Sequence, residues 1–216
     1  MRIAVIDSGI HDGHAHVGRV AGAVQFTADG EGSDPTDRLG HGTAVAGAIR
    51  EKVPAADLFA VKVFDRRLSV NIGAILRALA WCRAERMDVI NLSLGTPNEE
   101  HRASLTEAVA DNGTVVSAAH LLPGRLPGVV AVAADESCPR DNFRQHGGIF
   151  LASPYPRPIP GVPQSRNLQG VSFAVANMTG FVARALLTYP REQLYARLIG
   201  IANEFAETQL TKAERC

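Results

Sequence analysis

The sequence predicts an α/β fold in which helices cover both faces of a doubly wound, mostly parallel sheet. The first observation is a set of short runs that are apolar on both faces, as buried parallel strands are. The second is that helical patterns lie between such runs, which gives the alternation of a parallel sheet. The third is a length of 216 residues with 46% hydrophobic content, enough for one substantial core. We therefore expect a single domain over residues 1–216.

Five short runs rich in apolar and β-branched residues are the predicted strands. They lie at residues 3–6, 58–64, 89–94, 115–119 and 129–133. Because each run is apolar on both of its faces, we expect all five to be buried parallel strands.

The predicted helices come from apolar residues that recur at helical spacing. One pattern covers residues 72–79 after a cap at Ser69 or Asn71, and another covers residues 105–109 before a stop at Gly113. Near the end of the chain, the pattern predicts a buried helix and then an amphipathic helix that covers the sheet. These two helices are expected at 172–187 and 191–210.

The segment at residues 154–163 contains five prolines and is predicted to be a loop. Proline lacks a backbone N–H, so this segment cannot form a helix or a central strand. It is either a stiff surface connector, which we favour, or a rim that contacts a substrate.

Three glycine-flanked segments place an Asp, a His and a Ser in that order along the chain. These segments are VIDSG at 5–9, HGTAVAG at 41–47 and GVSFA at 170–174. Asp7 closes a predicted strand, while His41 and Ser172 each open a helical pattern, so all three are expected at the carboxyl-end edge of the sheet. A serine nucleophile needs a base within hydrogen-bond reach and a third group that orients the base, which these residue types supply.

The three segments resemble the motifs of the subtilisin-like serine proteases, the subtilase family. Those motifs are Asp-[Ser/Thr]-Gly, His-Gly-Thr-x-Val-Ala-Gly and Gly-Thr-Ser-x-Ala; the first two match in full and the third departs at Val171. The resemblance implies a subtilisin-like fold with Ser172 as nucleophile, His41 as general base and Asp7 as the group that orients His41. The spacing from His41 to Ser172 is shorter than is usual in the family, and we expect a small intracellular member without a propeptide.

The resemblance also implies how a peptide substrate binds. Residues 91–95 (NLSLG) are similar to the family segment along which substrate backbone pairs as an added strand, so Ser93 and Gly95 are expected to flank the substrate. Because Gly95 has no side chain, we expect a peptide backbone to approach closely there.

The family completes its oxyanion hole with an asparagine, and this chain has none in the corresponding segment. Residues 116–123 read VSAAHLLP. A gapless count places Leu122 at the asparagine position, and a two-residue deletion places His120 there, whose ring N–H is a candidate donor. In subtilisin itself, the loss of one such donor costs about 10²–10³-fold in turnover, so a slow enzyme and an inactive protein both fit. The backbone N–H of Ser172 remains as a donor.

We expect a serine endopeptidase of narrow specificity that removes a leader from one dedicated peptide or subunit. An unrestrained protease without a propeptide would damage the cell that makes it. One substrate type that fits is a modified peptide such as the small subunit of quinohemoprotein amine dehydrogenase. The alternative is a catalytically weak or inactive pseudoprotease that binds peptides.

Two other enzyme or binding classes fit less well. A nucleotide-binding protein would carry glycines at the required spacing after Gly9 or a phosphate loop, and neither is present. An esterase would carry a Gly-x-Ser-x-Gly elbow, where this chain has Ala174.

Composition and cysteine content limit the classes of binding partner and the cellular compartment that we expect for this protein. Lys plus Arg equals Asp plus Glu at 22 each, so no overall field favours nucleic acid or an anionic membrane surface. No apolar stretch approaches the length of a membrane span, and no signal peptide is recognisable. The odd, widely spaced set of Cys82, Cys138 and Cys216 fits a reducing compartment. We therefore expect a cytoplasmic protein.

A cluster of histidines near the start of the chain raises the question of a metal site. His11, His14 and His16 lie on a predicted turn together with Asp12. Alternate residues on a turn rarely converge on one ion, so we expect neither a metal nor a cofactor.

Overall fold

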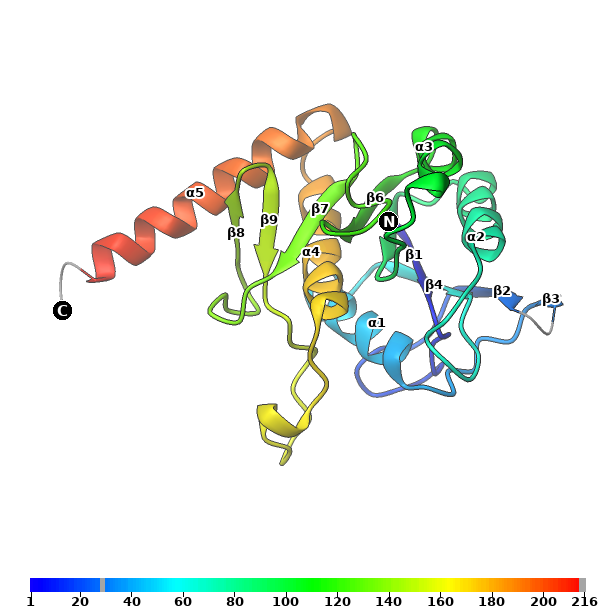
Figure 1. Ribbon diagram of the computed structural model, residues 1–216. Helices are drawn as coiled ribbons and strands as arrows, with labels where there is room; N and C mark the ends of the chain where they lie inside the picture. Colours follow the sequence, from blue (N-terminus) through cyan, green and yellow to red (C-terminus); the bar gives the residue numbers. More distant parts are fainter. Residues whose placement is uncertain (28–29, 214–216) are drawn as a thin grey trace.

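The computed structural model describes residues 1–27 and 30–213, and within them nine strands form one sheet (Figure 1). The strand order is β3-β2-β4-β1-β5-β6-β7-β9-β8. The strands are β1 (Arg2–Asp7), β2 (Gly22–Thr27), β3 (Gly30–Gly32), β4 (Asp57–Lys62), β5 (Val89–Leu92), β6 (Thr114–Ala118), β7 (Val130–Ala134), β8 (Phe143–His146) and β9 (Ile149–Ala152). The β2–β3 and β8–β9 pairs at the two edges are antiparallel, and the pairs between them are parallel.

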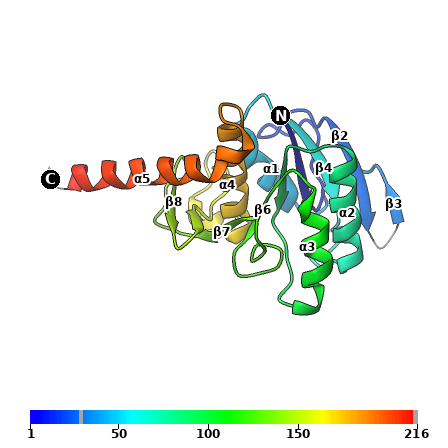
Figure 2. The same cartoon turned by 90° about the horizontal axis from the view of Figure 1, so that it is seen from above.

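Helices cover both faces of this sheet, as Figure 2 shows. The helices are α1 (His41–Lys52), α2 (Ile72–Ala84), α3 (Arg102–Ala110), α4 (Val171–Leu186) and α5 (Leu194–Ala213), with short 3-10 turns η1 (Glu99–His101), η2 (Gln164–Arg166) and η3 (Arg191–Gln193). One core lies between the sheet and α1, α4 and α5; the other lies between the sheet and α2 and α3. Along β1, Ile3 and Val5 enter the first core while Ala4 and Ile6 enter the second. The predicted fold class is therefore confirmed.

All five predicted strands are present, as β1, β4, β5, β6 and β7. The outer strands β2, β3, β8 and β9 were not predicted from the sequence. β8 carries Arg144, Gln145 and His146, and β2 is half-buried over most of its length, so neither has the continuous apolar run of a central strand.

The helix predictions hold with two corrections. The Asn71 side chain caps α2 by accepting a hydrogen bond from the Ala74 N–H at 2.9 Å, which decides between Ser69 and Asn71. The expected stop at Gly113 is wrong, because α3 already ends at Ala110 with Asp111 as its C-cap.

The second correction concerns α5, of which only the first half covers the sheet. Leu194, Leu198 and Ala202 are buried in the core with α4. Beyond them the helix projects away from the body of the protein (Figures 1 and 2).

The proline-rich segment is a loop, as predicted, and with η2 it extends away from the sheet (Figure 1). Within residues 1–27 and 30–213, no helix combines the length and the hydropathy that crossing a bilayer requires.

Candidate active site

Three elements bring Asp7, His41 and Ser172 to one edge of the sheet. Asp7 is the last residue of β1, His41 is the first residue of α1, and Ser172 is the second residue of α4. The carboxyl ends of parallel strands meet at this edge, which is where ligands bind in open α/β sheets.

The Asp7 carboxylate and the His41 ring form a hydrogen bond of 2.7 Å between Oδ1 and Nδ1. Asp7 is fully buried, and the His41 side chain is 15% exposed. A carboxylate only accepts hydrogen bonds, so Nδ1 must carry the proton and Nε2 of a neutral ring is left as a base. Gly42 lets the start of α1 pack closely beside Asp7, because a Cβ atom there would lie 2.1 Å from the Gly9 carbonyl oxygen and 3.2 Å from Asp7 Oδ1.

The environment of His41 raises the pKa of its imidazole above the ordinary value. Burial alone lowers this pKa, but the hydrogen bond to Asp7 and the negative charges of Asp7 and Asp37 outweigh burial. The protonated ring that forms when His41 accepts a proton is therefore stabilised.

Asp37 holds the start of α1 in place next to this pair. Its carboxylate accepts hydrogen bonds from the Thr43 N–H (2.8 Å), the Thr43 hydroxyl (2.7 Å) and the Gly40 N–H (2.8 Å). It also accepts a hydrogen bond of 2.9 Å from the Ser8 hydroxyl, and Ser8 adjoins Asp7. Asp37 therefore joins the end of β1 to the first turn of α1.

Ser172 is tied to the segment after β5 by reciprocal hydrogen bonds. Its hydroxyl donates to the Ser93 carbonyl at 3.3 Å, and the Ser93 hydroxyl donates to the Ser172 carbonyl at 3.1 Å. Asn91 donates to the Ser93 hydroxyl at 2.8 Å. The buried Thr179 hydroxyl shares its proton between Asn91 Oδ1 (3.0 Å) and Val175 O (2.8 Å). This chain of contacts fixes α4 against β5.

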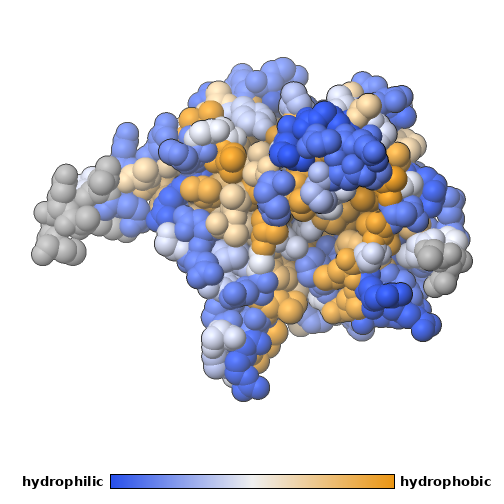
Figure 3. Space-filling model, viewed as in Figure 1, coloured by the Kyte–Doolittle hydropathy of each residue, from blue (hydrophilic) through white to orange (hydrophobic). Residues whose placement is uncertain are grey.

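His41 and Ser172 line the same cavity, which has a volume of about 430 Å³. Ser93 and Gly95 also line it, and apolar side chains form much of the remaining wall: Phe64, Leu68, Val70, Ile72, Ile75, Leu94 and Leu121. Figure 3 shows apolar side chains gathered on the surface between α1 and α2. The arrangement can bring an apolar peptide segment to the serine and histidine.

Comparison with known proteins agrees with this geometry. The model of the subtilase family matches residues 1–136, which is more than half of the chain. The chain belongs to this family. The matched range contains Asp7 and His41, and Ser172 lies beyond it.

Individual relatives are similar to this subtilase over most of the 216 residues of the present chain. The thermostable alkaline protease of Halalkalibacterium halodurans is 32% identical over 88% of the chain and 57% of its own length. Subtilisin E of Bacillus subtilis is 28% identical over 95% of the chain and 62% of its own length. The chain therefore spans about 60% of the length of these two relatives. A cold-adapted subtilisin-like serine proteinase of known structure has a TM-score of 0.70 at 21% identity, over 94% of this chain and 81% of its own, and so shares the fold.

The structure changes the explanation of Gly95 in this subtilase. Gly95 lines the cavity, but the space beside its Cα atom is filled by the chain itself. A Cβ atom there would lie 2.4 Å from the Leu122 carbonyl oxygen and 2.8 Å from the Leu121 Cβ atom. Thr96 and Leu122 exchange two backbone hydrogen bonds of 2.9 Å, which hold the segment after β5 against the turn after β6. Glycine is needed here for this internal contact.

The two oxyanion candidates lie outside the cavity wall. His120 is exposed, and Leu122 is buried in its bridge to Thr96. Of the residues in this turn, Leu121 lines the cavity. The Ser172 backbone N–H lies in the first turn of α4, where N–H groups have no partner within the helix, and Ser172 lines the cavity, so this N–H remains the candidate donor.

The histidine-rich turn lies on another side of α1, away from this cavity. The rings of His11, His14 and His16 stack edge to face, with centroids 6.2 and 5.3 Å apart. Within the described residues, no group of His, Cys, Asp and Glu side chains is arranged to hold a metal ion.

Sequence reasoning missed Asp37 and Thr179. Asp37 lies four residues before His41, and its role depends on a fold that brings residue 8 beside it. Thr179 lies seven residues after Ser172 in the same helix, and only the packing of α4 on β5 pairs it with Asn91.

Proposed function

We propose that this protein is a serine endopeptidase whose catalytic triad is Asp7, His41 and Ser172. The Ser172 oxygen attacks the peptide carbonyl while His41 Nε2 takes the hydroxyl proton. His41 then gives that proton to the leaving amine as the C–N bond breaks. In the second half of the reaction His41 Nε2 takes a proton from water, the water oxygen attacks the acyl carbonyl, and the Ser172 oxygen leaves and regains that proton from His41. Asp7 holds the His41 ring in one orientation and stabilises its protonated form.

The observation that carries this proposal is the 2.7 Å hydrogen bond between His41 and the fully buried Asp7, beside a cavity that also contains Ser172. A histidine that is paired with a buried carboxylate and lines a solvent-accessible cavity is suited to general acid–base catalysis. The Ser172 hydroxyl turns toward the Ser93 carbonyl in the free protein. Hydrogen bonds of catalytic groups are often loose before substrate binds and tighten in the complex.

The segment that contains Ser93 and Gly95 would bind the substrate residues before the cleaved bond. Both residues line the cavity beside Ser172, which supports a peptide lying along this segment as an added strand. The apolar wall favours aliphatic or aromatic substrate side chains in this part of the peptide.

We further propose a narrow-specificity maturation protease that removes a leader from one dedicated peptide or subunit. Thr96 and Leu121 line the same cavity as Ser172, and the Thr96–Leu122 bridge fixes this part of its wall, which supports selection among substrates. The small subunit of quinohemoprotein amine dehydrogenase is one candidate precursor type. A cytoplasmic location is supported by Cys82 and Cys138, which are buried free thiols.

The test compares hydrolysis of unfolded casein with cleavage of a precursor peptide that carries its leader, using the parent and Ser172→Ala. The proposal expects one discrete cut in the precursor, little digestion of casein, and no cleavage by Ser172→Ala. Equal digestion of casein would contradict narrow specificity. Equal cleavage by Ser172→Ala would contradict the catalytic assignment.

A second candidate function is a pseudoprotease that holds peptides without cutting them. It is favoured by the Ser172 hydroxyl bonding to Ser93 and by the apolar Leu121 in the cavity wall. It expects the parent and Ser172→Ala to bind the precursor peptide equally and to leave it intact.

A further inference from the structure

A second cavity of about 620 Å³ lies on a different side of α1 from the cavity that contains Ser172. Gly40, Thr43 and Ala44 line this second cavity; their spacing of three and four residues places them on one side of α1. His41, between them in sequence, faces the first cavity. The start of α1 therefore separates the two cavities.

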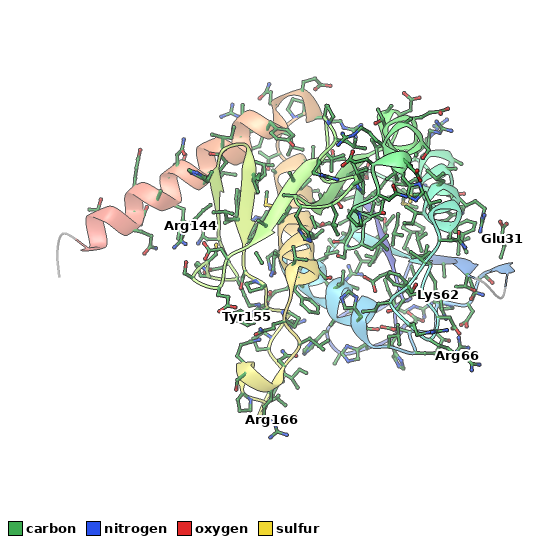
Figure 4. All side chains as sticks on the ribbon, in the orientation of Figure 1. Glu31, Lys62, Arg66, Arg144, Tyr155 and Arg166 are labelled. Atoms are coloured by element: carbon green, nitrogen blue, oxygen red, sulfur yellow. The ribbon has the colours of Figure 1, made fainter. Side chains whose placement is uncertain are left out.

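The opposite wall of the second cavity comes from the proline-rich loop and the segment that leads to Ser172. This wall contains Pro156, Arg157, Ile159, Arg166 and Leu168. Figure 4 shows Tyr155 at the base of the projecting segment and Arg166 at its far end. The histidine-rich turn completes the cavity.

The position of this cavity suits the part of a peptide that follows the cleaved bond. The proposed function places the preceding residues along Ser93 and Gly95. The remainder of the chain must then pass Ser172 and His41 and leave on the far side. That side is bounded by the start of α1 and by Leu168, four residues before Ser172.

The charges in the second cavity favour a negatively charged ligand. Within the described residues, neither Arg157 nor Arg166 forms a salt bridge. Arg157 is half-buried and held in place by a hydrogen bond of 3.3 Å to the His16 carbonyl. Burial and the positive charge of Arg157 lower the pKa of His16. Among the described residues that line this cavity, Asp37 is the one carboxylate, and it already accepts hydrogen bonds from the Ser8 hydroxyl and the first turn of α1.

Apolar surface lies next to these arginines. Ile159 is 44% exposed and Leu168 is 47% exposed, and both line the cavity. Two exposed aliphatic side chains lie beside two arginines that pair with no acidic side chain in the part of the chain that the structure describes, which fits a peptide with an apolar residue between carboxylates.

We propose that the second cavity binds the substrate segment after the cleaved bond and selects an apolar residue flanked by Asp or Glu. This inference rests on the proposed function, because it assumes that a peptide substrate runs along Ser93 and Gly95 and then past Ser172. Arg157 and Arg166 pair with the carboxylates, and Ile159 and Leu168 contact the apolar side chain. The protein would then select its substrate by residues on both sides of the cleaved bond.

The first test measures binding without cleavage, using Ser172→Ala. Two fluorescein-labelled peptides share an apolar first half; their second halves contain a leucine between two glutamates or between two glutamines. We expect the glutamate peptide to bind about tenfold more tightly, and each of Arg157→Gln and Arg166→Gln to reduce this preference about threefold. Raising the salt concentration to about 1 M is expected to remove it. Arg83→Gln, which removes an exposed arginine on α2, is the matched control.

Equal affinity for the two peptides would overturn the proposal, as would a preference that survives in the Arg157→Gln, Arg166→Gln double variant. A preference that Arg83→Gln lowers as much as the cavity variants would show a general charge effect and would also overturn it.

The parent protein separates this proposal from the proposed function. If the parent cleaves both peptides at one rate and Ser172→Ala binds them equally, the endopeptidase assignment stands and the cavity proposal fails. If Ser172→Ala shows the arginine-dependent preference while the parent never cleaves, the cavity proposal stands and the endopeptidase assignment fails.

Discussion

The Asp37 carboxylate accepts both the backbone N–H and the hydroxyl of Thr43, at 2.8 and 2.7 Å. Through the same group, Asp37 also binds Ser8, the neighbour of Asp7. Burial alone raises the pKa of Asp37, but its hydrogen bonds to Thr43, Ser8 and Leu39 lower the pKa below its ordinary value. A charged Asp37 therefore both positions α1 and adds negative potential at His41.

Asp37→Asn is expected to weaken catalysis and to shift its pH dependence. The amide keeps the shape of the side chain but loses the charge and places an NH₂ group against backbone donors. We expect about 1–3 kcal/mol loss in the free energy of unfolding. We also expect the pH midpoint of kcat/KM to fall below that of the parent, because the charge of Asp37 raises the pKa of His41. Asp111→Asn, at an exposed site, is the control. An unchanged pH midpoint would contradict a positioning role with an electrostatic component.

The parent is expected to gain activity as His41 loses its proton, with a midpoint above the ordinary histidine pKa of 6.5. The raised pKa also links His41 to stability. Its stabilising contribution is present in full below pH 6.5 and is lost as the pH rises through the pKa of the folded protein. Activity and unfolding should be measured on the same pH series. A flat activity profile across this range would count against His41 as the base.

Thr179→Val is expected to lower kcat with little change in KM. The substitution removes the hydroxyl that contacts Asn91 and leaves a buried acceptor without its donor, which costs about 1–3 kcal/mol in stability. The Asn91–Ser93 contact that holds Ser172 is then less fixed. Thr208→Val, where an exposed hydroxyl donates to the Glu204 carbonyl, is the control. A loss of stability with unchanged kcat would leave Thr179 with a packing role only.

Leu121→Asn is expected to raise kcat, because it introduces an amide N–H donor in the wall of the cavity that contains Ser172. A single oxyanion donor is worth about 10²–10³-fold in turnover where its geometry is right, so we expect a gain of at least about tenfold. Leu121→Ala separates this effect from that of a larger cavity. If both variants gain activity equally, the space beside Ser172 and not the donor limits the reaction.

The sequence was informative about the centre of the fold and less so about its edges. β1, β4, β5 and β6 have apolar runs because both faces of each are buried, and such runs are visible without a structure. β7 buries Val130 and Val132 on one face, and its other face carries the half-buried Ala131 and Ala133. β2 and β8 lie toward the sheet edges and mix polar with apolar residues. β2 pairs with β4, which is distant in sequence, so no local pattern predicted it. β8 pairs with β9 across the two-residue turn Gly147-Gly148, a local hairpin signal that was not used in the prediction.

The candidate site divides in a similar way. Short glycine-flanked motifs predicted Asp7, His41 and Ser172 as the candidate triad, because each motif is typical of a local geometry at the end of a strand or the start of a helix. The contacts of Asp37 and Thr179 cross between elements, and the choice among His120, Leu121 and Leu122 depends on the path of one turn. The second cavity arises from the packing of a loop against α1, which spacing along the chain does not encode.

Intact-mass spectrometry after treatment with a fluorophosphonate tests the triad most directly. The reagent forms a covalent bond with an activated serine and requires no knowledge of the substrate. We predict one adduct on the parent and none on Ser172→Ala or His41→Ala, with all three proteins folded by circular dichroism. Absence of an adduct on the folded parent, or an adduct that persists in Ser172→Ala, would contradict the assignment of Ser172 as a nucleophile activated by His41.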